Sequence, residues 1–333
     1  MNGPTPIGAT PARRRLSTQR QWRNAGLATC LVLILTACGG SSTGSDQTDR
    51  FVAGVNVTQL FAAPTTAELE AVRTLWQDRD VSAQGVTVEA TVPITLGGTP
   101  ATARVISHTV GGVRHYGAIL TPDNAPPGTL PVLMYSHESN DGIDVDALLD
   151  YASLAFDDLV DQFVFVVPSF RSEHLTVGGT TYESEGDPSP WGHDVDDALA
   201  LLNAAIATTP EADPERVGVL GFSRGATVGM LASIRDPRID LVVAYYGPTD
   251  FLGPFVEELV IETLEGNPRD LPGVNDLNAT LIQPLKDGER TIADVRSELI
   301  RRSPIHFAAD LPQLQLHHSS GDPIVPVGET ERL

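Results

Sequence analysis

Cysteine is nearly absent from this 333-residue sequence, and the short motifs that bind common cofactors are absent altogether. The only two cysteines, Cys30 and Cys38, lie near the N-terminus, so we expect the chain beyond them to fold without disulfides. There is no Gly-x-Gly-x-x-Gly, phosphate loop, His-Glu-x-x-His or Cys-x-x-Cys pattern. We therefore predict a protein that uses no nucleotide or metal cofactor.

Positive charge is also scarce, because 22 basic residues face 43 acidic ones and the formal net charge is −21. Five arginines and no acidic residue lie in the first 37 positions, so the rest of the chain is more acidic still. Such a surface repels phosphate backbones, which argues against a nucleic-acid partner. We interpret the acidity as favouring solubility, with attraction of a cationic substrate as the alternative.

Long apolar runs are limited to residues 25–37, behind an arginine-rich stretch. This run is too short to span a bilayer comfortably, and its layout is typical of a secretory signal. It ends in Leu35-Thr36-Ala37-Cys38, which resembles the lipobox of bacterial lipoproteins. The resemblance implies a signal peptide over 1–37, lipidation of Cys38 and a flexible tether over 38–64. An ordinary cleaved signal with a fortuitous cysteine is the alternative.

These N-terminal features predict where the protein is found. We expect an exported protein, anchored by lipid at Cys38 to a bacterial cell membrane, at the periplasmic face or the cell surface. The membrane would then be a partner only through that anchor.

Two kinds of apolar periodicity divide the rest of the chain. A helix is predicted from Thr65 or Thr66 to about Asp78, because apolar residues recur there on one face. Alternating residues joined by Gly-Gly pairs then predict antiparallel strands over 86–96, 101–110 and 113–121. Further along, continuous apolar runs alternate with helical patterns, which favours a parallel sheet buried on both faces. The expected strands of this part are 132–136, 163–167, 217–220, 241–246 and 314–317, and the expected helices are 145–160 and 195–207.

One segment carries a catalytic pattern: Gly221-Phe222-Ser223-Arg224-Gly225, between a predicted strand and a predicted helix. A serine hydroxyl is a poor nucleophile, so it must stand exposed on a strained corner beside a general base. Flanking glycines relieve crowding at such a corner, and the next backbone N–H can face a developing oxyanion. The pattern predicts acyl transfer through Ser223, and an incidental glycine-rich turn is the alternative.

This order of elements resembles the α/β-hydrolase fold over nearly the whole chain beyond the N-terminal segment. Three further segments are similar to prolyl-oligopeptidase-like and dienelactone-hydrolase-like serine hydrolases: residues 131–137, residues 242–247, and residues 303–306 leading to 317–326. The resemblance implies an α/β architecture, with a mostly parallel sheet flanked by helices and an antiparallel N-terminal lead-in.

The resemblance also implies a hydrolase domain over 65–333 with a helical insertion, or lid, over 250–302. Within that insertion, five apolar residues could either face substrate or pack on the core, and the sequence favours neither interpretation. They are Phe251, Leu252, Phe255, Leu259 and Leu264. The loop from Arg171 to Trp191 is expected to line the site, with Trp191 itself a packing anchor.

The expected activity is that of a serine esterase or small serine peptidase, acting on a small-molecule ester or peptide. Too few residues precede the sheet to build the β-propeller that gates the large oligopeptidases. A catalytically silent lipoprotein that keeps the fold for binding is the alternative.

The resemblance assigns the remaining site residues. It maps the catalytic acid onto Asp322, with Asp250 as the alternative acid and a turn-forming role as the alternative for Asp322. The oxyanion hole would use the backbone N–H groups of Arg224 and Glu138, where Glu138 replaces the usual glycine. We expect the Arg224 side chain to be an ion-pair partner rather than a substrate contact.

A general base is the missing part of this assignment. The histidine normally follows the acid in this fold, and no histidine follows Asp322. His318 is close to Asp322 in sequence but stands where the family's strand ends. We therefore expect the sequence to lack a last strand, the histidine loop and a final helix, and to be inactive as it stands.

Overall fold

The computed structural model describes residues 48–333, and for residues 153–158 it describes the backbone alone. The predicted signal peptide and Cys38 lie outside the described residues. No helix within 48–333 is long and apolar enough to cross a bilayer.

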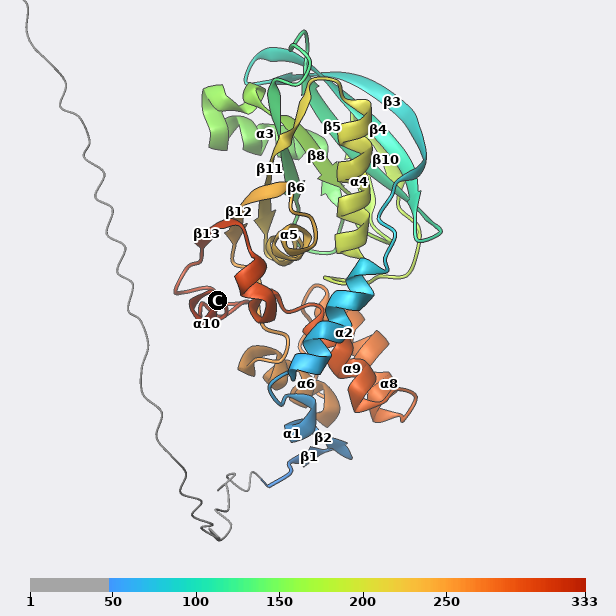
Figure 1. The fold of residues 1–333 in the computed structure, drawn as a ribbon, viewed down its shortest axis with the longest axis vertical. Coiled ribbons are helices and arrows are strands. Elements are labelled where there is room, and N and C mark those ends of the chain that lie inside the picture. Colours follow the sequence, from blue (N-terminus) through green and yellow to red (C-terminus); the bar gives the residue numbers. More distant parts are fainter. Residues whose placement is uncertain (1–47) are drawn as a thin grey trace, which may run out of the picture. The chain divides into compact units, whose positions relative to one another are not determined.

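An eight-stranded sheet forms the centre of the described chain, in the order β13-β12-β11-β6-β8-β5-β4-β3 (Figure 1). The five strands from β13 to β8 are parallel to one another, and β5, β4 and β3 continue the sheet in antiparallel fashion. The predicted mostly parallel sheet with an antiparallel lead-in is thus confirmed. The strands are β3 (Gln84–Leu96), β4 (Thr99–Val110), β5 (Val113–Pro122), β6 (Leu130–Ser136), β8 (Val164–Pro168), β11 (Ala212–Phe222), β12 (Ile239–Tyr245) and β13 (Gln313–His317).

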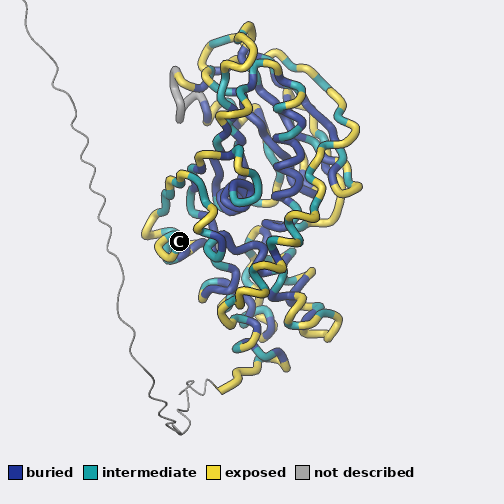
Figure 2. The backbone as a smooth tube through the Cα atoms, in the orientation of Figure 1, coloured by how far each residue is buried: buried dark blue, intermediate teal, exposed yellow. Residues whose placement is uncertain are grey.

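Helices pack on both faces of this sheet, and the strands alternate between two apolar clusters. In β6, Val132 and Met134 face the larger cluster, whereas Leu133 and Tyr135 face the smaller one. Residues from α4 (Asp194–Thr208) and α5 (Arg224–Arg235) join the larger cluster, and residues from α3 (Val145–Phe156) join the smaller. Figure 2 shows the central strands and α5 as mostly buried, which explains their continuous apolar runs.

Local sequence signals set several boundaries. Helix α2 (Thr66–Gln77) begins at a capping box, in which Thr65 accepts from the Glu68 N–H and the Glu68 carboxylate accepts from the Thr65 N–H. The Gly-Gly pairs between β3, β4 and β5 all have positive φ angles, as tight hairpin turns require. These predictions from sequence are confirmed.

A helical insertion separates β12 from β13, as predicted. It contains α6 (Pro254–Glu265), α7 (Val274–Leu277), a π-helical turn (Asn278–Ile282), α8 (Gln283–Lys286), α9 (Ile292–Ile300) and a 3₁₀ segment (Pro304–Asp310). The smaller elements are β1 (Phe51–Val52), β2 (Val55–Asn56), α1 (Val57–Leu60), β7 (Ile143–Asp144), a 3₁₀ segment (Asp157–Gln162), β9 (His174–Val177), β10 (Thr180–Glu183) and α10 (Gly328–Arg332).

The N-terminal part of the described chain corrects the predicted tether over 38–64. The β1–β2 hairpin and α1 lie within it, and Leu60 is completely buried in the larger apolar cluster. Arg296 of α9 donates to the backbone carbonyls of Gln59, Leu60 and Ala62 and also binds Glu68. Apolar burial and this one guanidinium hold the segment against the insertion, so it is part of the fold.

Candidate active site

Ser223 stands on a strained corner between β11 and α5. Its backbone has φ 48° and ψ −114°, a conformation that non-glycine residues rarely adopt. Its N–H donates to the Tyr245 carbonyl over 2.8 Å, which fixes the corner to the neighbouring strand β12. The hydroxyl itself makes no hydrogen bond within residues 48–333.

The glycines on either side of Ser223 are required by close backbone approach. A Cβ at Gly221 would lie 2.4 Å from the Gly225 carbonyl oxygen. A Cβ at Gly225 would lie 2.0 Å from the carbonyl oxygen of Ser136, at the end of β6. The sharp turn therefore forms only with glycine at both positions, which is the geometry expected of an elbow that presents a nucleophile.

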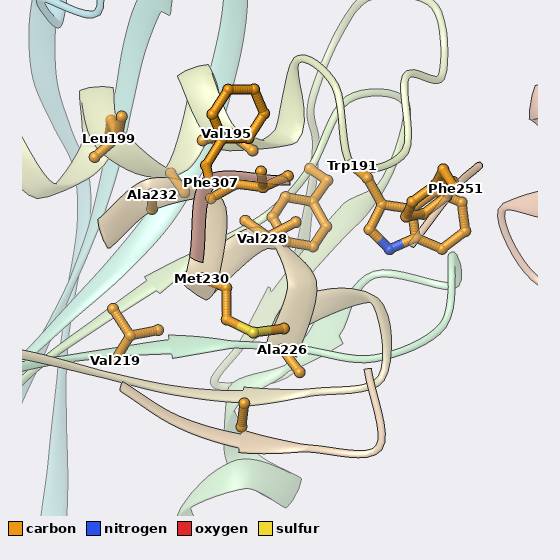
Figure 3. Packing of buried hydrophobic residues seen from close by; sticks show 14 of the residues in the cluster. Trp191, Val195, Leu199, Val219, Ala226, Val228, Met230, Ala232, Phe251 and Phe307 are labelled. Atoms are coloured by element: carbon orange, nitrogen blue, oxygen red, sulfur yellow. The ribbon is translucent and has the colours of Figure 1, made fainter. Parts of the chain in front are cut away.

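An apolar cavity of about 310 Å³ opens beside Ser223. Most of its wall comes from the insertion between β12 and β13, and its polar lining residues besides Ser223 are Glu138, Ser139 and Asn278. Trp191 also lines it and packs against Phe251, with ring centroids 5.0 Å apart (Figure 3). The wall thus combines the predicted lid with the loop that precedes α4.

The five apolar residues of the insertion with two alternative roles have different positions in the structure. Phe251, Phe255 and Leu259 line the cavity, whereas Leu252 and Leu264 are buried in the core cluster and do not line it. Trp191 has both roles considered for it, because it lines the cavity and is itself only 5% exposed.

The two predicted oxyanion donors follow the C-terminal ends of neighbouring strands, β11 and β6. Arg224 begins α5, so its N–H has no acceptor within the helix. Glu138 follows β6, which pairs with β11, and both Glu138 and Ser223 line the cavity. The Glu138 carboxylate accepts a hydrogen bond from the Tyr246 hydroxyl over 3.1 Å, and together with burial it raises the pKa of Tyr246. This bond ties the carboxylate to the end of β12.

The Arg224 side chain lies in a buried ion-pair cluster and does not line the cavity, as expected of an ion-pair partner. Its guanidinium binds Asp194 through two bonds of 2.7 and 2.9 Å and also contacts Glu173. The third guanidinium nitrogen, Nη1, donates to the Ser139 carbonyl over 3.0 Å, and the guanidinium carbon lies over the Phe170 ring. Burial raises the pKa of Glu173 to about 7, although the adjacent guanidinium opposes that shift.

This cluster supports the loop that follows β6. Arg224 holds the loop at Ser139, and Glu173 lies 3.5 Å from Nε2 of His137. Burial lowers the pKa of His137 to about 4, so the ring is neutral and its Nδ1–H donates to the Glu138 carbonyl over 2.9 Å. Buried polar contacts therefore hold the backbone around Glu138, the second predicted oxyanion donor.

Sequence reasoning did not identify the acidic partners in this region. Asp194, Asp196 and Asp197 all lie in the first turn of α4 and are all buried. Each binds different arginines: Asp194 binds Arg224, Asp196 binds Arg79 and Arg235, and Asp197 binds Arg171. The available signal was three acids in one helical turn, which usually indicates an exposed helix N-terminus.

Asp322 lies in the turn after β13, close to the cavity. Its Oδ1 accepts from the backbone N–H groups of Ile324 and Val325, and Val325 lines the cavity with Ser223. Asp250 instead lies 3.6 Å from Nε2 of His306 and 3.8 Å from Nε of Arg332, and it does not line the cavity.

No histidine contacts the Ser223 hydroxyl within residues 48–333. His318 has both ring nitrogens engaged, with Nδ1 2.7 Å from the Thr330 hydroxyl and Nε2 2.9 Å from the Val325 carbonyl. Its Nε2 also lies 3.6 Å from Asp322. Within residues 48–333, the structure thus brings Ser223, the predicted oxyanion residue Glu138 and the turn that contains Asp322 to one cavity, and no described histidine bonds Ser223.

Comparison with known proteins places this geometry in a class. The model of the Dienelactone hydrolase family matches residues 185–271, which include the elbow. Among solved structures, acetyl xylan esterase 1 from Thermoanaerobacterium sp. JW/SL YS485 is 16% identical with a TM-score of 0.54, over 80% of this chain and 84% of the esterase. The chain therefore has the α/β-hydrolase fold, so the predicted fold is confirmed, as is the similarity to dienelactone hydrolases over residues 185–271.

Two further structures are similar at lower TM-scores. An acetyl xylan esterase from Paenibacillus sp. R4 is 15% identical with a TM-score of 0.48, over 80% of this chain and 94% of that esterase. The acylaminoacyl peptidase of Pyrococcus horikoshii is 16% identical with a TM-score of 0.46, over 73% of this chain and 34% of the peptidase. No curated protein sequence matches the chain.

Proposed function

We propose that this protein is a serine hydrolase that transfers acyl groups through Ser223, from carboxylic esters or small peptides. The observation that carries the proposal is the strained backbone of Ser223, whose unbonded hydroxyl stands at the edge of an apolar cavity. Backbone strain of this kind is typical of functional sites. The match of residues 185–271 to a hydrolase family supports the same reaction class.

The reaction would proceed in two steps, acylation of Ser223 and hydrolysis of the acyl-enzyme. The Ser223 oxygen attacks the carbonyl carbon, the bond to the leaving group breaks, and the hydroxyl proton passes through a base to that group. Water then attacks the acyl-enzyme and releases the acid and free Ser223. The N–H groups of Arg224 and Glu138 would donate to the oxyanion in both steps, a contribution of about 3 kcal/mol per donor.

The base in this scheme is an imidazole that Asp322 would orient. Since no described histidine contacts Ser223, we expect the protein to hydrolyse esters slowly unless imidazole is added. Added imidazole can supply the missing group, because the space beside the hydroxyl is open to the cavity.

Hydrolysis of p-nitrophenyl butyrate tests the proposal on the full chain. We expect turnover that rises at least tenfold with millimolar imidazole, and loss of that turnover in Ser223→Ala. Ser320→Ala, which changes an exposed serine, is the matched control and should behave like wild type. Wild type that is no faster than Ser223→Ala, with or without imidazole, would show that the proposal is wrong.

A second candidate function is binding without catalysis. It is favoured by one observation, namely that the cavity is fully formed while Ser223 lacks a base contact within residues 48–333. Ligand binding in the absence of imidazole-dependent turnover would support it.

A further inference from the structure

The cavity beside Ser223 has a lining that selects among acyl groups. Its wall is apolar along the insertion, where Phe255, Leu259 and Val274 contribute carbon surface. Glu138 is the single charged residue of the lining, and Tyr246 already binds its carboxylate. A charged acyl group would therefore find no free counter-ion along this wall, and burying it there would be costly.

We propose that the protein acts on esters of neutral, medium-chain or compact aromatic acids, with the acyl group inside this cavity. This inference rests on the proposed function and adds the substrate class to it. A peptide is a poorer fit, because its amide groups need hydrogen-bond partners and the wall away from Ser223 offers only Asn278. An acetyl group is also a poor fit, because it would leave most of the cavity unfilled.

The size of the cavity sets the size of the acyl group. One water molecule takes up roughly 30 Å³ of liquid, so 310 Å³ equals the volume of about ten water molecules. That corresponds to an octanoyl chain or a substituted aromatic acyl group. The volume lies at the lower end of the range for small-molecule pockets, which excludes long fatty acyl chains from full burial.

The wall is rigid enough to impose this size. Gly273 has a φ of 75°, and a Cβ placed there would come within 2.7 Å of the Trp191 ring, so backbone packs directly on the indole. Trp191 in turn packs on Phe251, whose N–H donates to the Ser303 hydroxyl over 2.8 Å. The cavity is already open in this structure without a ligand, and these contacts support its wall.

Calorimetric titration with neutral amides tests the pocket without requiring turnover. We expect octanamide to bind the full chain at least about sixtyfold more tightly than acetamide, because each buried methylene contributes roughly fourfold and at least three of the six additional methylenes would be buried. Val274→Trp fills the cavity from the half-buried start of α7 and should remove most of that preference. Val274→Ala enlarges it and should shift the preference towards decanamide.

The control is Val88→Trp, the same change at an exposed position on β3, the edge strand at the other end of the sheet from β13. It should retain the wild-type preference. Equal affinity for acetamide and octanamide, or an unchanged preference in both Val274 variants, would overturn the inference. Failure of imidazole-dependent ester hydrolysis would instead overturn the proposed function, since octanamide binding does not depend on Ser223 chemistry.

Discussion

Replacement of Arg224 by methionine should destabilise the protein severely, because it removes the cation from a buried cluster. The guanidinium, 3% exposed, holds Asp194, which is fully buried, and Glu173, which is 5% exposed. Removing one partner of a buried ion pair costs about 3–5 kcal/mol. Since the pKa of Glu173 is already raised to about 7, this group can take up a proton, and the cost falls mainly on Asp194. We therefore predict that Arg224→Met lowers the free energy of unfolding by about 4 kcal/mol.

Urea unfolding of the full chain, followed by tryptophan fluorescence, measures this loss. Arg216→Met is the matched control, because Arg216 pairs with Asp213 at the surface and its side chain is 52% exposed. That control should lose less than about 1 kcal/mol.

A compensated variant separates uncompensated charge from lost packing. Adding Asp194→Asn and Glu173→Gln to Arg224→Met removes all three charges and should recover about half of the lost stability. The reasoning is refuted if Arg224→Met behaves like the surface control, or if the triple variant is no more stable than the single one.

Three other changes test separate parts of the structure. Gly225→Ala should lower the free energy of unfolding in urea by about 3 kcal/mol, because its Cβ would meet backbone atoms. Gly218→Ala, whose Cβ would have its nearest neighbour at 3.6 Å, should lower it by less than about 1 kcal/mol, and equal losses would contradict the elbow geometry. Arg296 lowers the pKa of Glu68 to about 2, so the stability that this pair contributes above about pH 4.5 should be lost as the pH falls towards 2. Glu68→Gln should flatten this part of the plot of stability against pH, and an unchanged plot would contradict the role of the pair. Cys38→Ala should move the protein from the membrane fraction to the soluble fraction, and retention in the membrane would argue against a lipid anchor.

Most of the fold could be predicted because its signals are local. Continuous apolar runs marked the parallel strands, and Gly-Gly pairs marked the hairpins. The β9–β10 hairpin and the first part of β11, before a register shift at Val217, were not predicted. Strand β9 has only four residues, too few for a recognisable alternation although Leu175 and Val177 are buried, and β10 and the start of β11 are mostly polar.

The candidate site was predictable only where one segment contains it. Ser223 and its glycines are contiguous, so the elbow could be inferred from sequence. The partners of Arg224 are 30 and 51 positions away: Asp194 begins α4, which packs on the sheet against β8, β4 and β11, and Glu173 lies between β8 and β9. Charge alone indicated exposure for these acids. Only the topology shows that Asp194 and Glu173 are enclosed.

Mass mapping of a fluorophosphonate adduct tests the central claim most directly. The probe forms a bond to an activated serine oxygen, and the modified peptide identifies which serine reacted. We predict that the full chain, treated in the presence of imidazole, carries the adduct on Ser223 alone, and that Ser223→Ala carries none. An adduct spread over several exposed serines, or one that persists in Ser223→Ala, would contradict the assignment of Ser223 as the nucleophile.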